Sequence, residues 1–530
     1  MRIIKKIKNL DIPKFVIIMF VVGLILRIVG IWFGLPLQLN IDEPTLVSSV
    51  LDLNRSLNPA HFEWPHLYFY INFVFYVVFV LLRKVITIFY QLPEVFYIVS
   101  PFFLISRSLS AIFGSLTVIS VYYISKDIFS KKVAYLSAFI MAILPVSVYE
   151  SHLAKVDTAN AFFTSIAIYF MWQVLKKGKL KSYILSGLWI GLSTSIKYNG
   201  ALLFFPLLMA HFLQKKSFDK KINVESIKSL VISGLVSVTA FYAGTPFALF
   251  DYKKFFSTER NVGAMWQIKN IGSVEWEKFP TEIYNTFVTM YQEHLGFGLW
   301  IIFILLITLF LFFNKRSREY IFLVLPIVFF SLYISRFDRS PGHYFVFLIP
   351  FYVPVLAGFI IEIIDFVTSK IMHFTKNLKV RINANFIYGF ILSLIFIPSI
   401  WSVVESNILL AKEDTRISAS KWVSENLDQT KDFLYVNGEE LKSVSFQKEN
   451  TEKVKKVDRG NIKQPAPFYL VIGVEDISLL DVTTGNKDPD KLSGNSEPIL
   501  ENAILELAVD NKWRLGPPIY IFKVLSVRED

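Results

Sequence analysis

Long apolar runs, separated by short polar stretches, fill the first three quarters of the chain. A helix that crosses a bilayer needs about 20 predominantly apolar residues, and many of these runs approach that length. The pattern therefore predicts membrane-spanning helices at 12–33, 101–124, 133–149, 158–175, 183–196, 199–213, 229–249, 298–313, 320–335, 344–365 and 386–404. The first run follows a basic N-terminus, but it is too long for a signal peptide and lacks a small-residue cleavage site, so we expect it to be retained.

One further apolar run, 67–82, is assigned by the positions of Lys and Arg. If this run does not cross, the Lys-rich connectors all fall on one side of the membrane: 2–14, 126–132, 176–181, 215–228, 315–318 and 370–381. Cytoplasmic loops are the ones that carry excess Lys and Arg. The rule therefore predicts 11 spans, a cytoplasmic N-terminus and an external C-terminus, with 67–82 as an amphipathic or re-entrant juxtamembrane helix in the first external loop.

The character of the chain changes near residue 411. From there to residue 530 it is polar and turn-rich, with strand-like pieces at 433–436, 468–472 and 519–524 and a helical pattern at 417–427. We therefore predict a polytopic α-helical membrane module over residues 1–410. A small C-terminal α/β domain would follow over residues 411–530, in an extracytoplasmic position.

Composition supports this class of protein. The chain is 53% hydrophobic, 16% aromatic and only 18% charged, with a mean hydropathy of +0.47, which is typical of a polytopic membrane protein. Its net charge of +12 lies largely in the connectors, so we attribute the charge to membrane topology rather than to nucleic-acid binding. The absence of cysteine excludes disulfides, thiolate catalysis and cysteine-ligated zinc.

The predicted topology brings the remaining ionisable residues together at the outer face. They lie in the external connectors: Asp42, Glu43, His61, Glu63, His66, Glu150, His152, Lys155, Asp157, Lys197, Glu293, His294, Arg336, Asp338, Arg339 and His343. An ionisable group at bilayer depth costs about 2.5–3.5 kcal/mol on insertion scales, so such groups tend to serve a function. One functional site on the outer face explains the distribution.

The residue types in this set indicate group transfer. Adjacent carboxylates such as Asp42 and Glu43 raise each other's pKa when desolvated, so that one can act as a base toward a hydroxyl. Lysine and arginine suit a phosphate leaving group, and Lys197, Arg336 and Arg339 are candidates. Together they favour transfer from a lipid-linked phosphate donor to a hydroxyl.

Each assignment has a simpler alternative. The Asp42–Glu43 pair could be a solvated loop pair, Asp157 could be solvated at the interface, and Lys197 could extend its ammonium group to the membrane surface. Arg336 and Arg339 could pair with Asp338. A divalent-metal site at Glu63 and His294 is a further alternative, because carboxylate and imidazole suit zinc or manganese, although no ligand spacing supports it.

Two other function classes are also open. A polytopic transporter or lipid flippase needs polar groups near the bilayer midplane and often has repeated halves. Here the spans are nearly free of central charges and show no internal repeat. A catalytically silent scaffold or sensor would leave the external polar cluster without a role.

Several short motifs follow one another in an order that resembles the C-type membrane glycosyltransferases, most closely the protein O-mannosyltransferase and aminoarabinose-transferase branch. The resemblance extends to about residue 425 and rests on these motifs: Asp42-Glu43, Phe62-Glu63-Trp64-Pro65, Arg107 with Ser110 and Gly114, Asp157, Ser195-Ile196-Lys197-Tyr198, and Asp414-Thr415-Arg416 with Trp422. One departure is Trp64-Pro65-His66, where relatives often have Lys-Pro-Pro.

The resemblance implies a glycosyltransferase with a dolichyl- or undecaprenyl-phosphate sugar as donor and an extracytoplasmic hydroxyl, on a protein, lipid or glycan, as acceptor. It implies that Asp42 is the catalytic carboxylate with Glu43 in support, and that Asp157 orients the acceptor or tunes Asp42. It also implies that a basic group, Arg107, joins the cationic residues that hold the departing phosphate. Juxtamembrane helices in the first external loop are a feature of this family too.

Overall fold

The computed structural model describes residues 12–37, 40, 42–93, 98–214, 224–260, 262–270, 272–312, 317–338, 341–377, 383–428, 432, 434–436, 454–456, 467–473, 500–509 and 519–527. The chain divides into two compact units. The first, which we call the helical unit, comprises residues 1–31 and 42–404, and the second, the C-terminal unit, comprises 32–41 and 405–530. The predicted domain boundary after residue 410 stays a prediction.

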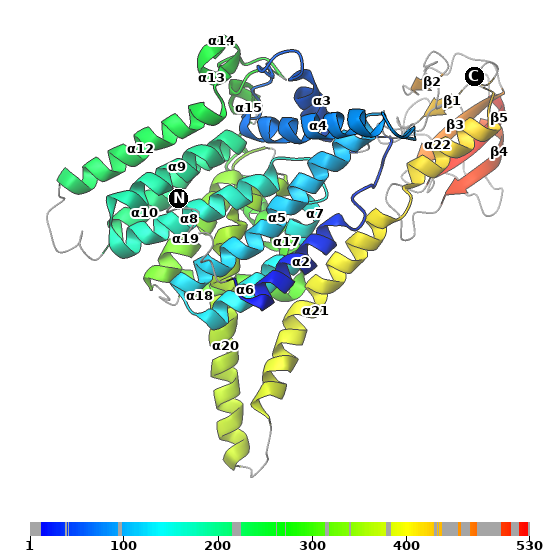
Figure 1. Cartoon of the computed structure of the whole chain (residues 1–530). Coiled ribbons are helices and arrows are strands. Elements are labelled where there is room, and N and C mark those ends of the chain that lie inside the picture. The colour runs from blue at the N-terminus through cyan, green and yellow to red at the C-terminus, as the bar shows by residue number, and fades with distance from the viewer. Residues whose placement is uncertain are drawn as a thin grey trace. The chain divides into compact units, whose positions relative to one another are not determined.

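The helical unit is built from helices of very different lengths (Figure 1). In chain order they are α2 (Lys14–Ile28), α3 (Glu43–Asp52), α4 (Leu67–Ile86), α5 (Ser100–Ile128), α6 (Lys131–Ile143), α7 (Pro145–Glu150), α8 (Asp157–Lys177), α9 (Leu180–Ile196), η2 (Tyr198–Leu203), α10 (Phe204–Phe212), α12 (Val224–Gly244), α13 (Phe247–Phe250), α14 (Tyr252–Phe255), α15 (Met265–Asn270), α16 (Phe279–Tyr284), η3 (Asn285–Met290), α17 (Tyr291–Leu295), α18 (Phe297–Phe312), α19 (Arg318–Ile334), η4 (Gly342–Leu348), α20 (Ile349–Asn377) and α21 (Ala384–Ala411).

Every apolar run predicted to span the membrane contains at least one helix in the structure. Within the described residues, five helical stretches are both long and apolar enough to cross a bilayer: Leu67–Ile86, Ser100–Ile128, Ile227–Gly244, Gly342–Thr375 and Ala384–Asn426. Shorter apolar helices lie at Tyr198–Phe212 and Phe297–Leu311. The chain is therefore a multi-pass membrane protein, while the number of 11 spans stays a prediction.

The predicted span 133–149 is broken into α6 and α7. Leu144 is extended (φ −67°, ψ 118°) because the residue before a proline disfavours the helical region, and Pro145 then starts α7. The guanidinium of Arg27 binds the carbonyl groups that the break exposes. It donates to the carbonyl oxygens of Met141 and Ala142 at 2.9 and 3.0 Å and to Oγ of Ser147 at 2.9 Å. These hydrogen bonds fix the geometry of the break, and the break sets the direction of α7 and of the segment 151–156 that follows it.

The core of the helical unit lies among α5, α6, α8, α19 and the first turns of α20. Helix α5 is buried at positions all around its axis, from Phe103 to Ile128. At Gly114 a side chain is excluded, because an added Cβ would lie 2.3 Å from Oγ of Ser151 and 3.0 Å from Nε of Arg27. The α5 backbone therefore approaches α2 and the loop after α7 closely.

Helix α4 is attached to α5 by one face. The hydroxyl of Tyr68 lies 2.9 Å from Oγ of Ser110, and that of Tyr76 lies 2.6 Å from Oγ of Ser106. The opposite face of α4 is exposed and apolar and includes Val78 and Leu82. Length and composition place α4 among the helices able to cross a bilayer. Its predicted position in the first external loop stays a prediction.

The C-terminal unit contains a mixed five-stranded sheet of order β2-β1-β3-β5-β4. Its elements are α22 (Thr415–Asn426), β1 (Leu434–Val436), β2 (Val454–Lys456), β3 (Phe468–Gly473), β4 (Leu500–Val509) and β5 (Ile519–Val527). Strand β1 runs parallel to β2 and β3, whereas β5 is antiparallel to β3 and β4. Ala419 and Val423 of α22 pack with Val471 and Ile521 in a small core.

Candidate functional site

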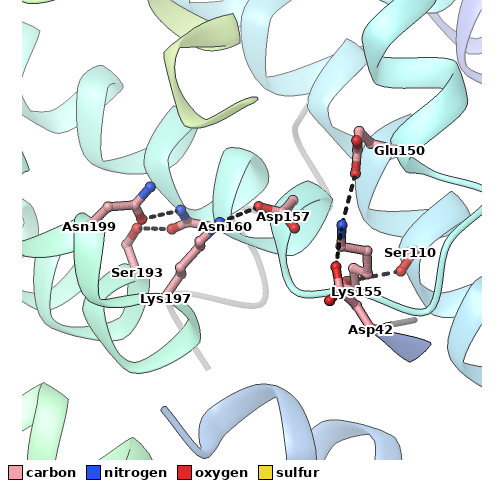
Figure 2. A network of polar contacts seen from close by, with 9 residues as sticks. All are labelled: Asp42, Ser110, Glu150, Lys155, Asp157, Asn160, Ser193, Lys197 and Asn199. Atoms are coloured by element: carbon pink, nitrogen blue, oxygen red, sulfur yellow. Dashed lines mark hydrogen bonds and ion pairs between the residues drawn. The ribbon is translucent and has the colours of Figure 1, made fainter. Parts of the chain in front are cut away.

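Several of the polar side chains predicted for the outer face converge at the ends of helices of the helical unit. The first turn of α3, the segment 151–156 between α7 and α8, the first turn of α8 and the end of α9 supply them (Figure 2). Segment 151–156 is held in place by its neighbours. His152 binds the carbonyl oxygens of Val148 and Val29, and Ser110 donates to the carbonyl oxygen of Lys155 at 3.1 Å.

Glu43 and Arg107 form an ion pair in the interior of the helical unit. Nε and Nη2 of Arg107 donate to the two carboxylate oxygens of Glu43 at 2.7 and 2.6 Å, and both side chains have no exposed surface. Arg107 Nη1 also donates to the carbonyl oxygen of Ile31, and the Ala154 amide donates to Glu43 at 2.7 Å. The pair therefore links α2, α3, α5 and the segment before α8.

Asp42, the neighbour of Glu43, has a different environment. One of its carboxylate oxygens, Oδ2, lies 3.0 Å from the ammonium of Lys155, and 42% of its side-chain surface is exposed. The same ammonium lies 4.0 Å from Oε2 of Glu150. Lys155 is only 7% exposed and stands between the two carboxylates, as Figure 2 shows.

A second ion pair lies beside the first. Lys197 donates to Oδ1 of Asp157 at 2.6 Å, with 3% of the Asp157 side chain and 17% of the Lys197 side chain exposed. Behind them, Ser193 donates to Asn160 at 2.8 Å and Asn160 donates to Asn199 at 2.6 Å, so α8 and the end of α9 are joined. This network fixes the position of the Lys197 ammonium.

Burial and charge act in opposite directions on the carboxylates. Burial raises the pKa of Glu150 to about 7, partly offset by Lys155, while Asp157 adds to the rise. Burial would also raise the pKa of Asp157, but Lys197, His343 and Lys155 together lower it to about 2. Burial alone would lower the pKa of Lys155, yet the carboxylates of Glu150, Asp157 and Asp42 raise it. The ammonium of Lys155 is therefore charged at neutral pH.

Two neighbouring histidines, His343, which interacts with Asp157, and His294, are uncharged at neutral pH. Burial lowers the pKa of His343 to about 4, although the charge of Asp157 opposes the shift. Burial lowers that of His294 to about 3, and nearby His343 adds to the effect. Tyr344, next to His343, presents its ring 4.9 Å from the Lys197 ammonium. The segment 343–344 therefore borders the second ion pair.

The other predicted residues have different surroundings. Arg336 donates to the carbonyl oxygen of Val274 and lies 4.0 Å from the ring centre of Trp276, contacts that hold the segment around 274–279. Arg339 lies outside the described residues. Within the described part of the chain, no group of three or more His, Asp or Glu side chains is placed to hold a metal ion, so the metal alternative at Glu63 and His294 gains no support.

Sequence reasoning assigned Glu150, Lys155 and His343 to the same predicted face as Asp42 and Asp157 but gave them no individual role. A signal was present, because Glu150, His152, Lys155 and Asp157 crowd one short connector between two apolar runs. Asn160 and Ser193 were missed, since each lies within an apolar run where a single polar residue is unremarkable. Only the pairing of α8 with α9 makes them part of the site.

Comparisons with known proteins cover part of the chain. The family model for dolichyl-phosphate-mannose-protein mannosyltransferases matches residues 103–242. The Bacillus subtilis (strain 168) protein YkcB is 25% identical over 130 residues, which are 24% of this chain and 18% of that protein. Dolichyl-phosphooligosaccharide-protein glycotransferase 2 of Archaeoglobus fulgidus is 31% identical over 137 residues, 26% of this chain and 22% of its own. The matches thus span about a fifth of either relative.

The fold has a counterpart among solved structures. The Archaeoglobus fulgidus oligosaccharyltransferase tethered with an acceptor peptide superposes with a TM-score of 0.51 at 12% identity, covering 87% of this chain and 69% of that one. The family match spans α5, α8 and α9, which carry Arg107, Asp157 and the network around Asn160. Residues 103–242 thus match the dolichyl-phosphate-mannose-protein mannosyltransferase family, in agreement with the resemblance to the C-type membrane glycosyltransferases, and the fold is similar to that of the oligosaccharyltransferase.

Proposed function

We propose that this protein is an integral-membrane glycosyltransferase that moves a sugar from a polyprenyl-phosphate-linked donor to a hydroxyl of an extracytoplasmic acceptor. The observation that carries the proposal is the position of Asp42. Among the carboxylates of the network in Figure 2, Asp42 combines substantial exposure, 42%, with a buried cation at 3.0 Å. It is thus accessible to a substrate and held in one orientation.

The chemistry follows from these groups. As the acceptor hydroxyl oxygen bonds to the anomeric carbon of the sugar, Asp42 takes the hydroxyl proton. The bond between that carbon and the phosphate oxygen breaks, and the electron pair leaves with the polyprenyl phosphate. A positioned carboxylate base typically contributes about 10²–10⁴-fold to rate.

The departing phosphate needs a cation. Lys197 is suited to this task, because its ammonium is held by Asp157 but stays 17% exposed. A preorganised cation stabilises developing negative charge without reorganising during the reaction. We assign Asp157 the role of holding Lys197, and we keep Arg336 and Arg339 as further candidate cations for the donor phosphate.

The geometry favours a positioning role for Glu43 and Arg107. Both carboxylate oxygens of Glu43 accept hydrogen bonds inside the protein, and its partner Arg107 is also fully buried. We therefore propose that they hold the start of α3, and with it Asp42, rather than acting as a second catalytic carboxylate and a phosphate ligand.

The membrane arrangement belongs to the same proposal. We propose 11 spans with a cytoplasmic N-terminus, and an outer face that carries the site and the C-terminal unit as an extracytoplasmic α/β domain. The donor would be a dolichyl- or undecaprenyl-phosphate sugar that reaches the site from the bilayer. The acceptor would be a protein, lipid or glycan on that side.

The direct test is Asp42→Asn, which keeps the shape of the side chain and removes the base. In membranes supplied with a radiolabelled polyprenyl-phosphate sugar, we expect release of polyprenyl phosphate to fall by about 10²–10⁴-fold. Asp52→Asn, at the exposed end of the same helix α3, is the matched control and should keep the wild-type rate.

Near-wild-type release by Asp42→Asn would refute the assignment. Movement of intact labelled lipid across the bilayer by the wild-type protein, without cleavage, would favour the transporter or flippase. The gel-filtration profile of the purified variant shows whether it is folded.

A further inference from the structure

Glu150 is a buried carboxylate that the proposed reaction does not use. It ends α7, its side chain is 9% exposed, and in the described part of the chain its Oε2 has no hydrogen-bond partner. The nearest cation is the Lys155 ammonium, 4.0 Å away, which is already 3.0 Å from Asp42. A single lysine is thus shared by two carboxylates at unequal distances.

We infer that Glu150 is a positioning residue that sets the strength of Asp42 as a base by competing for the charge of Lys155. When Glu150 is ionised, it draws on the Lys155 charge and Asp42 binds a proton more strongly. When Glu150 is protonated, Lys155 acts on Asp42 alone and Asp42 is a weaker base. The inference rests on the proposed function of Asp42.

The surroundings make Glu150 the group that changes charge. Lys155, Asp157, Lys197 and Asp42 are the charged residues that act on it most. Asp157 is neutralised by Lys197 at 2.6 Å. Because burial holds the pKa of Glu150 near 7, its charge changes around neutral pH.

Groups on the other elements that pack against α7 keep one charge state in this range. The guanidinium of Arg27 in α2 binds the end of α6, and that of Arg107 in α5 is neutralised by Glu43. His294 of α17 and His343 of η4 are uncharged, because burial lowers the pKa of each to about 3 and about 4.

The segment 151–156 is held rigidly, so Glu150 and Asp42 compete directly for the Lys155 ammonium. The Lys155 backbone is tied to Ser110, and the neighbouring amide of Ala154 is tied to Glu43. The ammonium can therefore respond to Glu150 only by small shifts between the two carboxylates. Switching a charge on within about 7 Å of a base in a site of intermediate dielectric changes its rate by roughly threefold to tenfold.

The first measurement is the pH dependence of polyprenyl phosphate release. For the wild-type protein we expect the rate to rise by roughly threefold to tenfold as pH passes through about 7. Glu150→Gln should lose this step and keep the lower rate throughout. Glu150→Asp should restore a step, whereas Glu277→Gln, an exposed control, should keep the wild-type profile. The inference is overturned if Glu150→Gln keeps the wild-type step. It is also overturned if Glu150→Gln is slower than the wild-type protein by the same factor below and above pH 7.

A second measurement needs no turnover and separates this inference from the proposed function. Infrared titration of the purified protein follows the protonated carboxyl band of Glu150, assigned by its loss in Glu150→Gln. We expect a midpoint near pH 7 in the wild-type protein. Asp42→Asn, which leaves Lys155 to Glu150, should lower that midpoint by roughly one pH unit. An unchanged midpoint would show that the two carboxylates do not compete, whatever reaction the protein catalyses.

Discussion

Asp42 and Glu43 are adjacent in the chain yet occupy opposite environments. Glu43 is fully buried, with both oxygens bound by Arg107 and a third hydrogen bond from Ala154. Asp42 is 42% exposed and shares a lysine with Glu150. The start of α3 lies between them, and consecutive residues at a helix start point in different directions. We therefore propose that Glu43 secures the start of the helix while Asp42 reaches the substrate.

The comparison shows that a carboxylate bound tightly inside the protein is not available to a substrate. A buried carboxylate with both oxygens bound inside the protein, as in Glu43 with its three hydrogen bonds, gives stability but is closed to a substrate. Asp42, which lies beside a cation that it shares with Glu150, is oriented and still accessible. We propose that this motif, which looks like a catalytic pair in the sequence, has one structural member, Glu43, and one reactive member, Asp42.

The largest effect on stability should come from breaking the buried pair. Arg107→Met leaves Glu43 buried without its cation, which typically costs about 3–5 kcal/mol of unfolding free energy. The double variant Glu43→Gln/Arg107→Met should lose less than Arg107→Met alone, because no uncompensated charge is left. Thermal unfolding of the detergent-purified proteins measures both.

A matched control for this prediction is Lys132→Met. Lys132 and Asp365 form a pair at 3.0 Å in which both side chains are 52% exposed. Exposed pairs contribute under about 1 kcal/mol. If Arg107→Met were no more harmful than Lys132→Met, the division between a structural Glu43 and a reactive Asp42 would fail.

Sequence reasoning predicted the helices of this arrangement because long apolar runs report membrane helices directly, whereas the sidedness inferred from the basic connectors stays a prediction. It located Asp42, Asp157 and Lys197 at one face, and it predicted a helix at every described apolar run. It could not separate Asp42 from Glu43. Their partners, Lys155 and Arg107, lie more than sixty residues away along the chain. Only the packing of α3 against α5 and the segment 151–156 decides which carboxylate meets which cation.

Helix breaks were the other feature that the apolar pattern concealed. Hydropathy is continuous through Leu144 and Pro145, so 133–149 looked like one span. The proline was a readable signal for the break, but the guanidinium of Arg27 that binds the free carbonyl groups comes from α2 and could not be assigned from sequence. Glu150 owes its position to that break.

A smaller effect is expected from Asp157→Asn, and it depends on pH. The folded-state pKa of Asp157 is lowered to about 2, with Lys197 and His343 opposing the effect of burial. A lowered pKa means that the ionised form adds stability above pH of about 4, which is lost as pH falls toward 2. The midpoint of thermal unfolding should therefore fall more steeply between about pH 4 and pH 2 in the wild-type protein than in the variant.

Parallel pH curves for the wild-type protein and Asp157→Asn would contradict this prediction. They would indicate that Lys197 does not stabilise the Asp157 carboxylate. Asp338→Asn is a useful control, because Asp338 is a carboxylate of the same predicted face at a more exposed position. It should leave the steep wild-type dependence unchanged.

The smallest effect should come from Ser110→Ala, which tests whether the loop that carries Lys155 must be held rigidly. Ser110 donates to the carbonyl oxygen of Lys155 at 3.1 Å and lies 2.9 Å from the Tyr68 hydroxyl. Removing the hydroxyl should cost about 1 kcal/mol of unfolding free energy. If the whole of this free energy were needed to keep Lys155 in its position beside Asp42, polyprenyl phosphate release would fall by about fivefold. Ser108→Ala, which removes a bond within α5 itself, should leave release unchanged. If Ser110→Ala and Ser108→Ala left polyprenyl phosphate release equally unchanged, Asp42 would not need a rigidly held Lys155. The segment that carries Lys155 would then differ from the tightly bound Glu43 in the same way as Asp42 does.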